Sequence, residues 1–299
     1  MQIPQKTVRY RPSDKLREVL GGSLCGAKTI AQHNVTIRTD RAVQRACGRT
    51  GWAEQSTMAR PLRACTAEHV AQLAQVFWSS LKRYGVTPRH RFRATRWWVD
   101  LDLTPRPLGA QAEGRERPWR GRNRSTTGRK TLRITARPSR ASLHETLLRG
   151  QATAVPALQA ALLEVETSRG WPRERRAQMV LRVDGGFGTP EVLNGLLRRG
   201  SQVVAKRSNR GRGQKVRQAV GPWQPPASPG RELAAVRRPH RCWRTTRPWV
   251  MRTPKAQGGC QEAGVLTTWP DLAPATVAEA DDSRARIEAT LCQEKQALG

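Results

Sequence analysis

Strand and helix signals alternate between residues 96 and 206, and this alternation constrains the fold more than any other feature of the chain. Four short apolar runs are typical of strands: Trp97–Leu103, Thr131–Ala136, Met179–Val183 and Gln202–Lys206. A helix is expected over residues 143–169, and a second one begins at Pro190 after the N-cap Thr189 and stops at Gly200. This order predicts an α/β core.

The residues before this core predict a small helical domain. We place it at residues 1–93 and the α/β domain at 94–299. A helix pair is expected over residues 40–49 and 50–65, with Ser56 as the N-cap of the second helix, and a longer helix over 66–85. Such a pair in a basic chain can read DNA, but Pro61 interrupts its second helix and short helix pairs are common. Both interpretations stay open.

Residues 207–262 differ from the rest of the chain because they are rich in proline and basic residues and contain Trp223, Trp243 and Trp249. They predict an insertion or a loosely structured subdomain. A strand at 264–268 and a closing helix at about 276–297 then complete the core.

The charge of the chain indicates its partner. Lys and Arg number 54 against 23 Asp and Glu, a net charge of +31. A polyanion is expected, with nucleic acid first. The 37% hydrophobic content and ten Trp favour a folded protein over a disordered basic chain. No apolar run is long enough to span a membrane. The six cysteines are scattered and form no Cys-x-x-Cys pair, which argues against a structural zinc site. Such cysteines fit a reducing, cytoplasmic location.

Acidic residues that belong to or directly follow a buried strand need a reason in so basic a chain. Asp100 and Asp102 are two apart in one strand and so point to the same face. Asp184 ends the next clear strand, before Gly185, and Glu288 lies on the closing helix. Carboxylates converging from two strands and a helix are what a two-metal Mg²⁺ or Mn²⁺ site requires.

The closing helix carries two cations near its acid. Arg284, Glu288 and Lys295 are four and seven residues apart, so they fall within about 40° on one helix face. Such a face can combine a metal ligand with two phosphate-binding groups. An ordinary surface ion pair at i, i+4 extended by a lysine has the same spacing, and spacing alone favours that simpler interpretation.

Three blocks together resemble the DDE transposases of bacterial insertion sequences. The segment 281–295 is similar to the Tyr-x₂-Arg-x₃-Glu-x₆-Lys signature, with Asp281 in place of the tyrosine. Residues 181–206 resemble the second-aspartate block, and Val99–Pro105 resembles the first-aspartate strand. The blocks occur in the family's order, and the resemblance covers roughly residues 96–299.

The resemblance implies a ribonuclease H-like core preceded by a helical domain, with a basic, β-rich insertion at about 207–262. It implies Asp102, Asp184 and Glu288 as catalytic metal ligands, with Asp100 as the alternative to Asp102, and a two-metal Mg²⁺ or Mn²⁺ site. The reaction is nicking and strand transfer on double-stranded DNA, at element ends and target, and a homodimer in the synaptic complex is compatible with it. Candidate phosphate-binding residues are Arg284, Lys295, Lys206, Arg207, Arg210, Arg212, Lys215, Arg217, Arg122, Arg124, Arg129 and Lys130.

Two alternatives remain beside an active transposase. The missing tyrosine and a C-terminus only four residues after Lys295 fit a truncated or inactive remnant that binds DNA without catalysis. A basic RNA-binding protein explains the charge but not the ordered acids.

Overall fold

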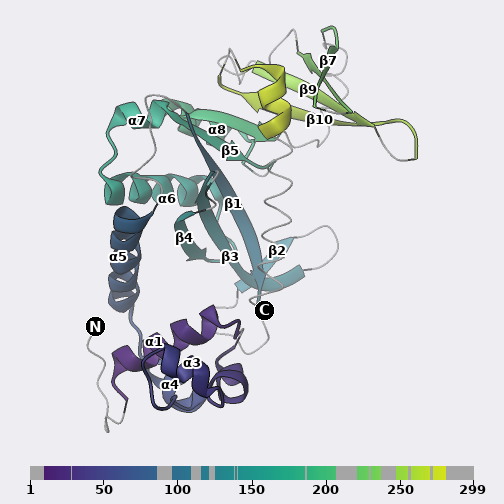
Figure 1. Ribbon diagram of the computed structural model, residues 1–299. Helices are drawn as coiled ribbons and strands as arrows, with labels where there is room; N and C mark the ends of the chain where they lie inside the picture. Colours follow the sequence, from purple (N-terminus) through teal and green to yellow (C-terminus); the bar gives the residue numbers. More distant parts are fainter. Residues whose placement is uncertain are drawn as a thin grey trace. The chain divides into compact units, whose positions relative to one another are not determined.

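The computed structural model describes residues 10–27, 29–85, 96–108, 116–120, 125–137, 139, 141–185, 187–206, 221–228, 230–236, 247–254, 257–269 and 272–280. They divide into two compact units, whose described parts are residues up to 81 and residues from 82 onward (Figure 1). The expected domain boundary at residues 93 and 94 lies outside the described residues. Each unit is considered by itself.

The first unit is helical. Its elements are α1 (Pro12–Leu24), α2 (Ile30–Gln32), the π-helical turn η1 (His33–Ile37), α3 (Arg41–Ala46), α4 (Gln55–Arg63) and the start of α5 (Ala67–Tyr84). Trp52 and Met58 are at the centre of its apolar core. Glu18 is buried beside this core, where its carboxylate accepts hydrogen bonds from the Arg49 guanidinium at 3.0 Å and the Ala53 N–H at 2.7 Å. Burial raises the pKa of Glu18.

The expected helix pair corresponds to α3 and α4. Asp40 caps α3 by accepting from the N–H groups of Ala42 and Val43. The prediction that Ser56 caps the second helix is wrong, because α4 begins one residue earlier, at Gln55. The Gln55 N–H donates to the Asn34 side chain at 3.0 Å, so a residue distant in sequence supplies the acceptor that a local cap would have given. DNA reading by this pair stays a prediction.

The second unit is built on one mixed sheet. Its strands are β1 (Trp97–Pro107), β2 (Glu116–Arg120), β3 (Ser125–Ala136), β4 (Ser142–Leu148), β5 (Met179–Val183), β6 (Gln202–Lys206), β7 (Gln224–Ser228), β8 (Arg231–Ala235), β9 (Arg247–Pro254) and β10 (Cys260–Thr267). The order across the sheet is β2-β3-β1-β5-β6-β10-β9-β8-β7, with β4 also paired to β3. The helices that connect its central strands are α6 (Ala154–Arg169), α7 (Arg173–Ala177) and α8 (Pro190–Arg198).

The central strands have the ribonuclease H-like arrangement. β4, β3 and β1 are antiparallel neighbours, whereas β1, β5 and β6 are parallel. Helices α6 and α7 connect β4 to β5, and α8 connects β5 to β6 (Figure 1). Parallel neighbours need such crossovers, and the alternation seen in the sequence supplies them. The chain is therefore an α/β protein with a ribonuclease H-like core, as the resemblance implied.

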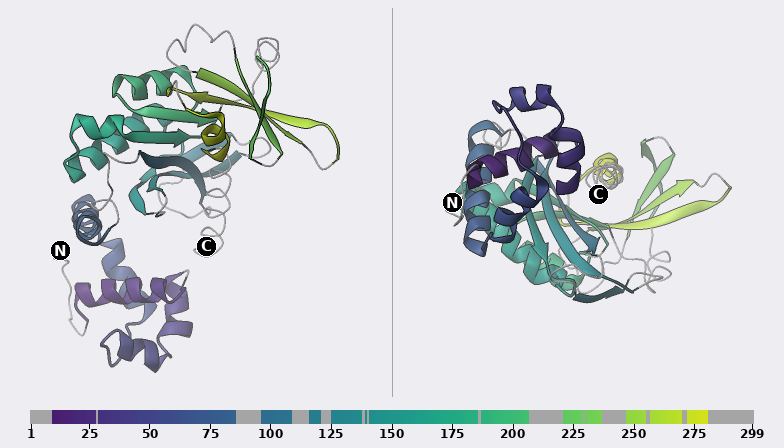
Figure 2. Two further views of the ribbon diagram at one scale, coloured as in Figure 1. Left: turned by 45° about the horizontal axis from the view of Figure 1, so that its top comes forward. Right: turned by 90° about the horizontal axis from the view of Figure 1, so that it is seen from below.

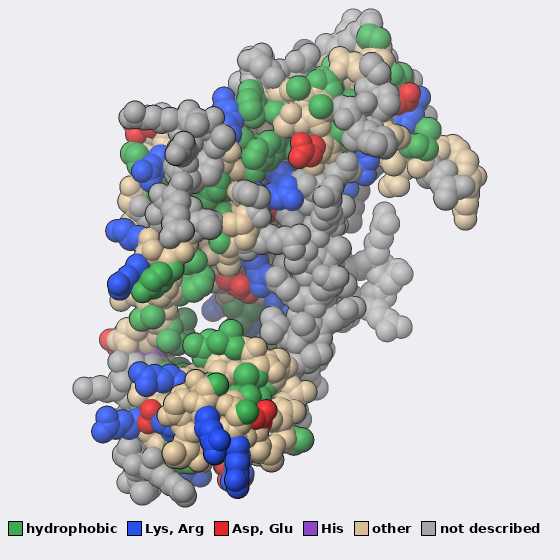
Figure 3. All heavy atoms as spheres, in the orientation of Figure 1, with side chains coloured by type: hydrophobic (Ala, Val, Ile, Leu, Met, Phe, Trp, Pro, Cys, Tyr) green, Lys and Arg blue, Asp and Glu red, His purple; other side chains and the backbone are tan. Residues whose placement is uncertain are grey.

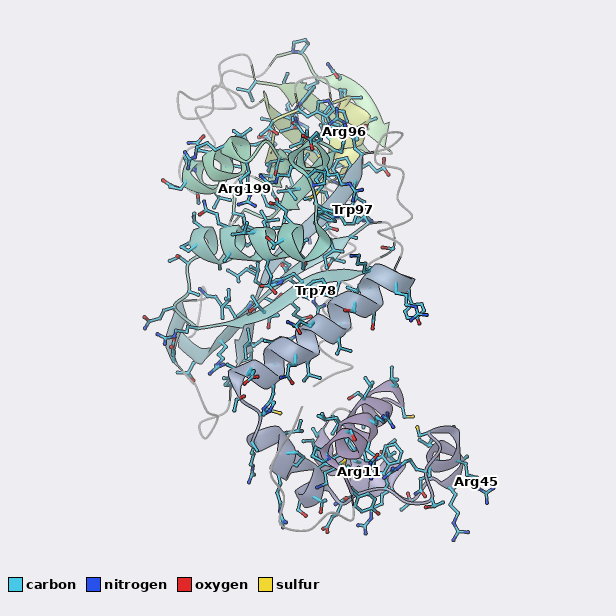
Figure 4. The ribbon with its side chains drawn as sticks, turned by 90° about the vertical axis from the view of Figure 1, so that its left-hand side faces the viewer. Arg11, Arg45, Trp78, Arg96, Trp97 and Arg199 are labelled. Carbon is cyan, nitrogen blue, oxygen red and sulfur yellow. The ribbon has the colours of Figure 1, made fainter. Side chains whose placement is uncertain are left out.

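Alternate residues of the central strands face two separate cores. Leu101, Leu181 and Val203 face one core with α6 and α8, whereas Val180 and Val204 face a second core with a short helix at residues 274–280. Figure 2 shows this helix on the other side of the sheet from α6. Trp97 packs edge-on against Trp171 on the α6 side, with ring centroids 5.0 Å apart (Figure 4).

Strands make up most of the described part of residues 207–262, where the resemblance implies a β-rich insertion. Strands β7, β8, β9 and β10 pair in succession, and β10 also pairs with β6, so the insertion extends the core sheet. The strand expected at residues 264–268 coincides with the end of β10. Residues 274–280 are helical, and the rest of the closing helix expected at about 276–297 lies outside the described residues. No helix in the described part of the chain is long and apolar enough to cross a membrane.

The helix expected over residues 143–169 is wrong in its first part. Residues 142–148 form β4, which pairs with β3, and the helix begins only at Ala154. β3 extends from Ser125 to Ala136, and on the side away from β1 it pairs with β2 only at residues 125–128. Residues 130–135 of that edge are paired by β4, and this pairing satisfies the backbone of both strands.

A candidate active site at the strand ends

Two acids and a lysine form a row across three neighbouring strands. The last paired residues of the parallel ladders are Leu101 with Val183, and Val183 with Ala205. The residue that follows these pairs is Asp102 on β1, Asp184 directly after β5, and Lys206 on β6. All three belong to the face of the sheet opposite α6 and α8. The sheet therefore brings together three of the residues singled out from the sequence.

Local contacts fix the two carboxylates. The Thr104 hydroxyl, two residues along the same face of β1, donates to Asp102 Oδ2. The Phe187 N–H lies 3.2 Å from Asp184 Oδ1, and the Phe187 ring is buried in the core, which anchors the turn after β5. A Cβ on Gly188 would lie 2.7 Å from the Lys206 carbonyl oxygen, so glycine lets this turn pack against β6.

Asp100 has a different environment from Asp102. It is 2% exposed and forms a buried ion pair with Arg182, whose Nε donates to Oδ1 at 2.5 Å. Arg137 Nε lies 4.0 Å from the other oxygen. A carboxylate already held by a guanidinium is poorly placed to bind a cation, which favours Asp102 over Asp100 as the metal ligand.

The third acid and its neighbouring cations lie beyond the described residues. Glu288, Arg284 and Lys295 follow the helix at residues 274–280, which lies on the same face of the sheet as Asp102 and Asp184. Within the described residues, no group of three His, Cys, Asp or Glu side chains could hold a metal ion. Two carboxylates on adjacent strands, at the point where their parallel pairing ends, nevertheless offer the hard oxygen ligands that Mg²⁺ and Mn²⁺ prefer, so the donor set fits such an ion in part.

The candidate phosphate-binding residues divide between described and undescribed parts of the chain. Lys206, Arg129 and Lys130 are described, and Lys206 is exposed. The Lys130 ammonium donates to the Ala152 carbonyl at 2.8 Å, and burial lowers its pKa, so it links β3 to the segment before α6. Outside the described residues lie Arg122, Arg124, Arg207, Arg210, Arg212, Lys215 and Arg217. Figure 3 shows Lys and Arg side chains over the surface of both units.

The sequence reasoning missed Arg182. The signal was present, because an arginine inside the apolar run Met179–Val183 needs an acidic partner, and Asp100 lies inside another such run. Which acid it meets depends on the register of β1 against β5, where Asp100 and Arg182 are directly paired.

No protein-family model and no characterised protein sequence matches the chain. Among solved structures, the piggyBac transposase synaptic complex with hairpin DNA is similar over 92% of this chain and 56% of that chain, with 11% identity and a TM-score of 0.45. A pre-cleavage Mos1 transpososome is similar over 68% and 61%, with 12% identity and a TM-score of 0.23. The catalytic domain of human endonuclease V is similar over 76% and 99%, with 14% identity and a TM-score of 0.28. The chain thus spans 56% and 61% of the two transposase chains it matches.

Proposed function

We propose that the chain is a DDE transposase that nicks DNA and transfers strands with the help of divalent metal ions. The observation that carries the proposal is the row of Asp102, Asp184 and Lys206, which directly follow the last paired residues of the parallel ladders β1–β5 and β5–β6 in a ribonuclease H-like sheet. The resemblance of residues 281–295 to an insertion-sequence signature adds Glu288 as the third acid. The net charge of +31 supports DNA as the partner.

Each residue of the row has a part in this reaction. Asp102, Asp184 and Glu288 would hold Mg²⁺ or Mn²⁺, which when bound activates the attacking oxygen and stabilises the leaving oxygen at a phosphodiester. Lys206 lies beside Asp184 and would bind a neighbouring phosphate as a point charge. Arg284 and Lys295 would orient the scissile phosphate. The protein would act in a bacterial cytoplasm, as a homodimer bound to the element ends.

The test is DNA cleavage by the full chain. We expect supercoiled plasmid or element-end DNA to be nicked with Mn²⁺ or Mg²⁺ and not with a chelator. Asp102→Asn, Asp184→Asn and Glu288→Gln should each lower the rate by about 100-fold or more, the scale on which removing charge-stabilising groups acts. Glu174→Gln is the matched control, because Glu174 is an exposed acid on α7 in the same unit.

Three results would change the assignment. Tight duplex binding without cleavage under either metal would favour an inactive remnant that binds DNA. Cleavage that survives in Asp184→Asn would place the chemistry elsewhere. A preference for structured RNA over duplex DNA would contradict both transposase interpretations.

A further inference from the structure

Arg182 is a buried arginine on β5 that contacts two other segments of the second unit, β1 and the helix at residues 274–280. It is 2% exposed on β5, and its Nε and Nη2 both lie 2.5 Å from Asp100 Oδ1 on β1. Its Nη1 donates to the Ala280 carbonyl at 2.7 Å, in the helix at residues 274–280. The guanidinium carbon also lies 6.0 Å from the centre of the Trp98 ring.

These three segments are the ones that carry the candidate site. Asp102 follows Asp100 by two residues on β1, Asp184 follows Arg182 by two residues, and Glu288 follows Ala280 by eight. One guanidinium therefore joins the residues two positions before Asp102 and Asp184 to the helix that precedes Glu288 in the sequence. Its planar fork can hold a carboxylate and a carbonyl at once, which the single ammonium of a lysine cannot do with the same geometry.

Stability alone does not account for this arrangement. A buried ion pair loses hydration on both sides, and apolar residues of similar volume often stabilise a fold as well or better. The pair also lies on the acidic face, where an uncompensated Asp100 would be a second carboxylate on the same strand as Asp102. Bound to Arg182, Asp100 adds little negative charge to that face.

We propose that Arg182 is a positioning residue of the metal site: it fixes β1, β5 and the last helix relative to one another and keeps Asp100 out of metal coordination. This inference rests on the proposed function. It assigns Arg182 no contact with substrate or metal. Its effect is on where Asp102 and Asp184 are held, and on the helix at residues 274–280 whose Ala280 carbonyl it binds.

The test replaces the pair without leaving a buried charge. In the full chain, Asp100→Leu together with Arg182→Met should keep cooperative unfolding with Tm within a few degrees of the unmodified chain. We expect Mn²⁺ affinity, measured by calorimetry or electron paramagnetic resonance, to fall about 10- to 100-fold, the range seen when residues supporting metal ligands are lost. Without metal, hydrogen exchange in residues 274–280 should become faster, because the bond to the Ala280 carbonyl is gone.

Two further variants keep the result interpretable. Arg182→Lys retains the positive charge but lacks the planar guanidinium, so it should weaken Mn²⁺ binding and speed hydrogen exchange in residues 274–280. If the double variant does not fold, this variant tests the positioning role in its place. Glu166→Gln alters another buried ion pair in the same unit, on the α6 side, and should leave Mn²⁺ affinity unchanged.

The outcomes separate this inference from the proposed function. Mn²⁺ affinity within twofold of the unmodified chain, or unchanged exchange at residues 274–280, in a folded variant overturns the positioning role. If the unmodified chain binds no Mn²⁺, or if Asp184→Asn leaves its Mn²⁺ affinity unchanged, the proposed function fails. The positioning role then fails with it.

Discussion

His33 is a buried histidine in the helical unit, and its ring lies against Gly22 of α1. It is 2% exposed, and a Cβ built on Gly22 would overlap the ring. Burial lowers the pKa of His33, since the charged form loses its hydration. The folded chain therefore resists protonation at His33, whereas the unfolded chain accepts a proton near pH 6.5.

The first prediction is a pH effect on stability. Below the unfolded pKa, the unfolded state binds a proton that the folded state lacks, so the stability contributed by neutral His33 is lost as pH falls, at up to about 1.4 kcal/mol per pH unit. In thermal unfolding, the unmodified chain should be more stable than His33→Gln at pH 7.5. This difference in stability should become smaller as the pH is lowered to 5.5. An advantage that stays constant over this range would show that His33 does not titrate on unfolding.

Gly170 ends α6 with a left-handed backbone, at φ 59°. Nothing lies within 4 Å of a Cβ built there, so a side chain meets no steric obstacle and only the backbone conformation is strained. Gly170→Ala should lower the free energy of unfolding by about 1–2 kcal/mol in urea titrations, and Gly170→Asn by less, because asparagine tolerates this region better. Equal losses for Ala and Asn would mean that the cost arises elsewhere.

At the scale of elements, Glu166 connects three helices. It lies on α6, is 4% exposed, and its Oε2 lies 2.9 Å from Arg176 Nη2 and 2.7 Å from Arg199 Nη2. Arg176 belongs to α7 and Arg199 follows α8; Figure 4 labels Arg199 beside these helices. The crossover helices are thus held to each other by one carboxylate, in addition to their packing on the sheet.

Removing the Glu166 carboxylate should weaken the contacts among α6, α7 and the end of α8, and so lower the stability of the fold. Glu166→Ala should cost about 2–3 kcal/mol in denaturant unfolding, less than the 3–5 kcal/mol for fully buried pairs because both arginines are partly exposed. Arg176→Gln should cost clearly less, since Arg199 still meets the carboxylate. If the two variants are equally destabilised, Arg199 does not contribute.

Sequence reasoning located the elements whose signals are local and failed where pairing is distant. β1, β5 and β6 are dense apolar runs bounded by turn residues, and Thr189, Pro190 and Gly200 mark the limits of α8, so these elements could be predicted. The segment of β4 has leucines spaced as on a helix, and its pairing with β3 decides its conformation. Asp102 could be found as an acid inside an apolar strand, and Asp184 as an acid at a strand end. Arg182 and Asp100, in contrast, are 82 residues apart and meet only through the parallel register.

For the whole molecule, the excess of 54 Lys and Arg over 23 Asp and Glu makes salt the sharpest test of DNA binding. Each phosphate contact releases counterions, so affinity for a duplex should fall steeply between 50 and 200 mM salt, by about 10³–10⁵ for 6–10 contacts. The slope of log affinity against log salt counts those contacts. Single lysines can then be assigned to the interface or to the fold.

Lys206 and Lys130 form a matched pair for this measurement. Lys206 is exposed in the row with the two acids, so Lys206→Gln should reduce the salt slope by about 1 with little change in Tm. Lys130 donates to the Ala152 carbonyl, so Lys130→Gln should lower Tm and leave the slope unchanged. Fluorescence anisotropy of a labelled duplex across a salt series measures both slopes. If Lys206→Gln leaves the slope unchanged, the DNA path does not pass over the part of the sheet that carries Asp102 and Asp184.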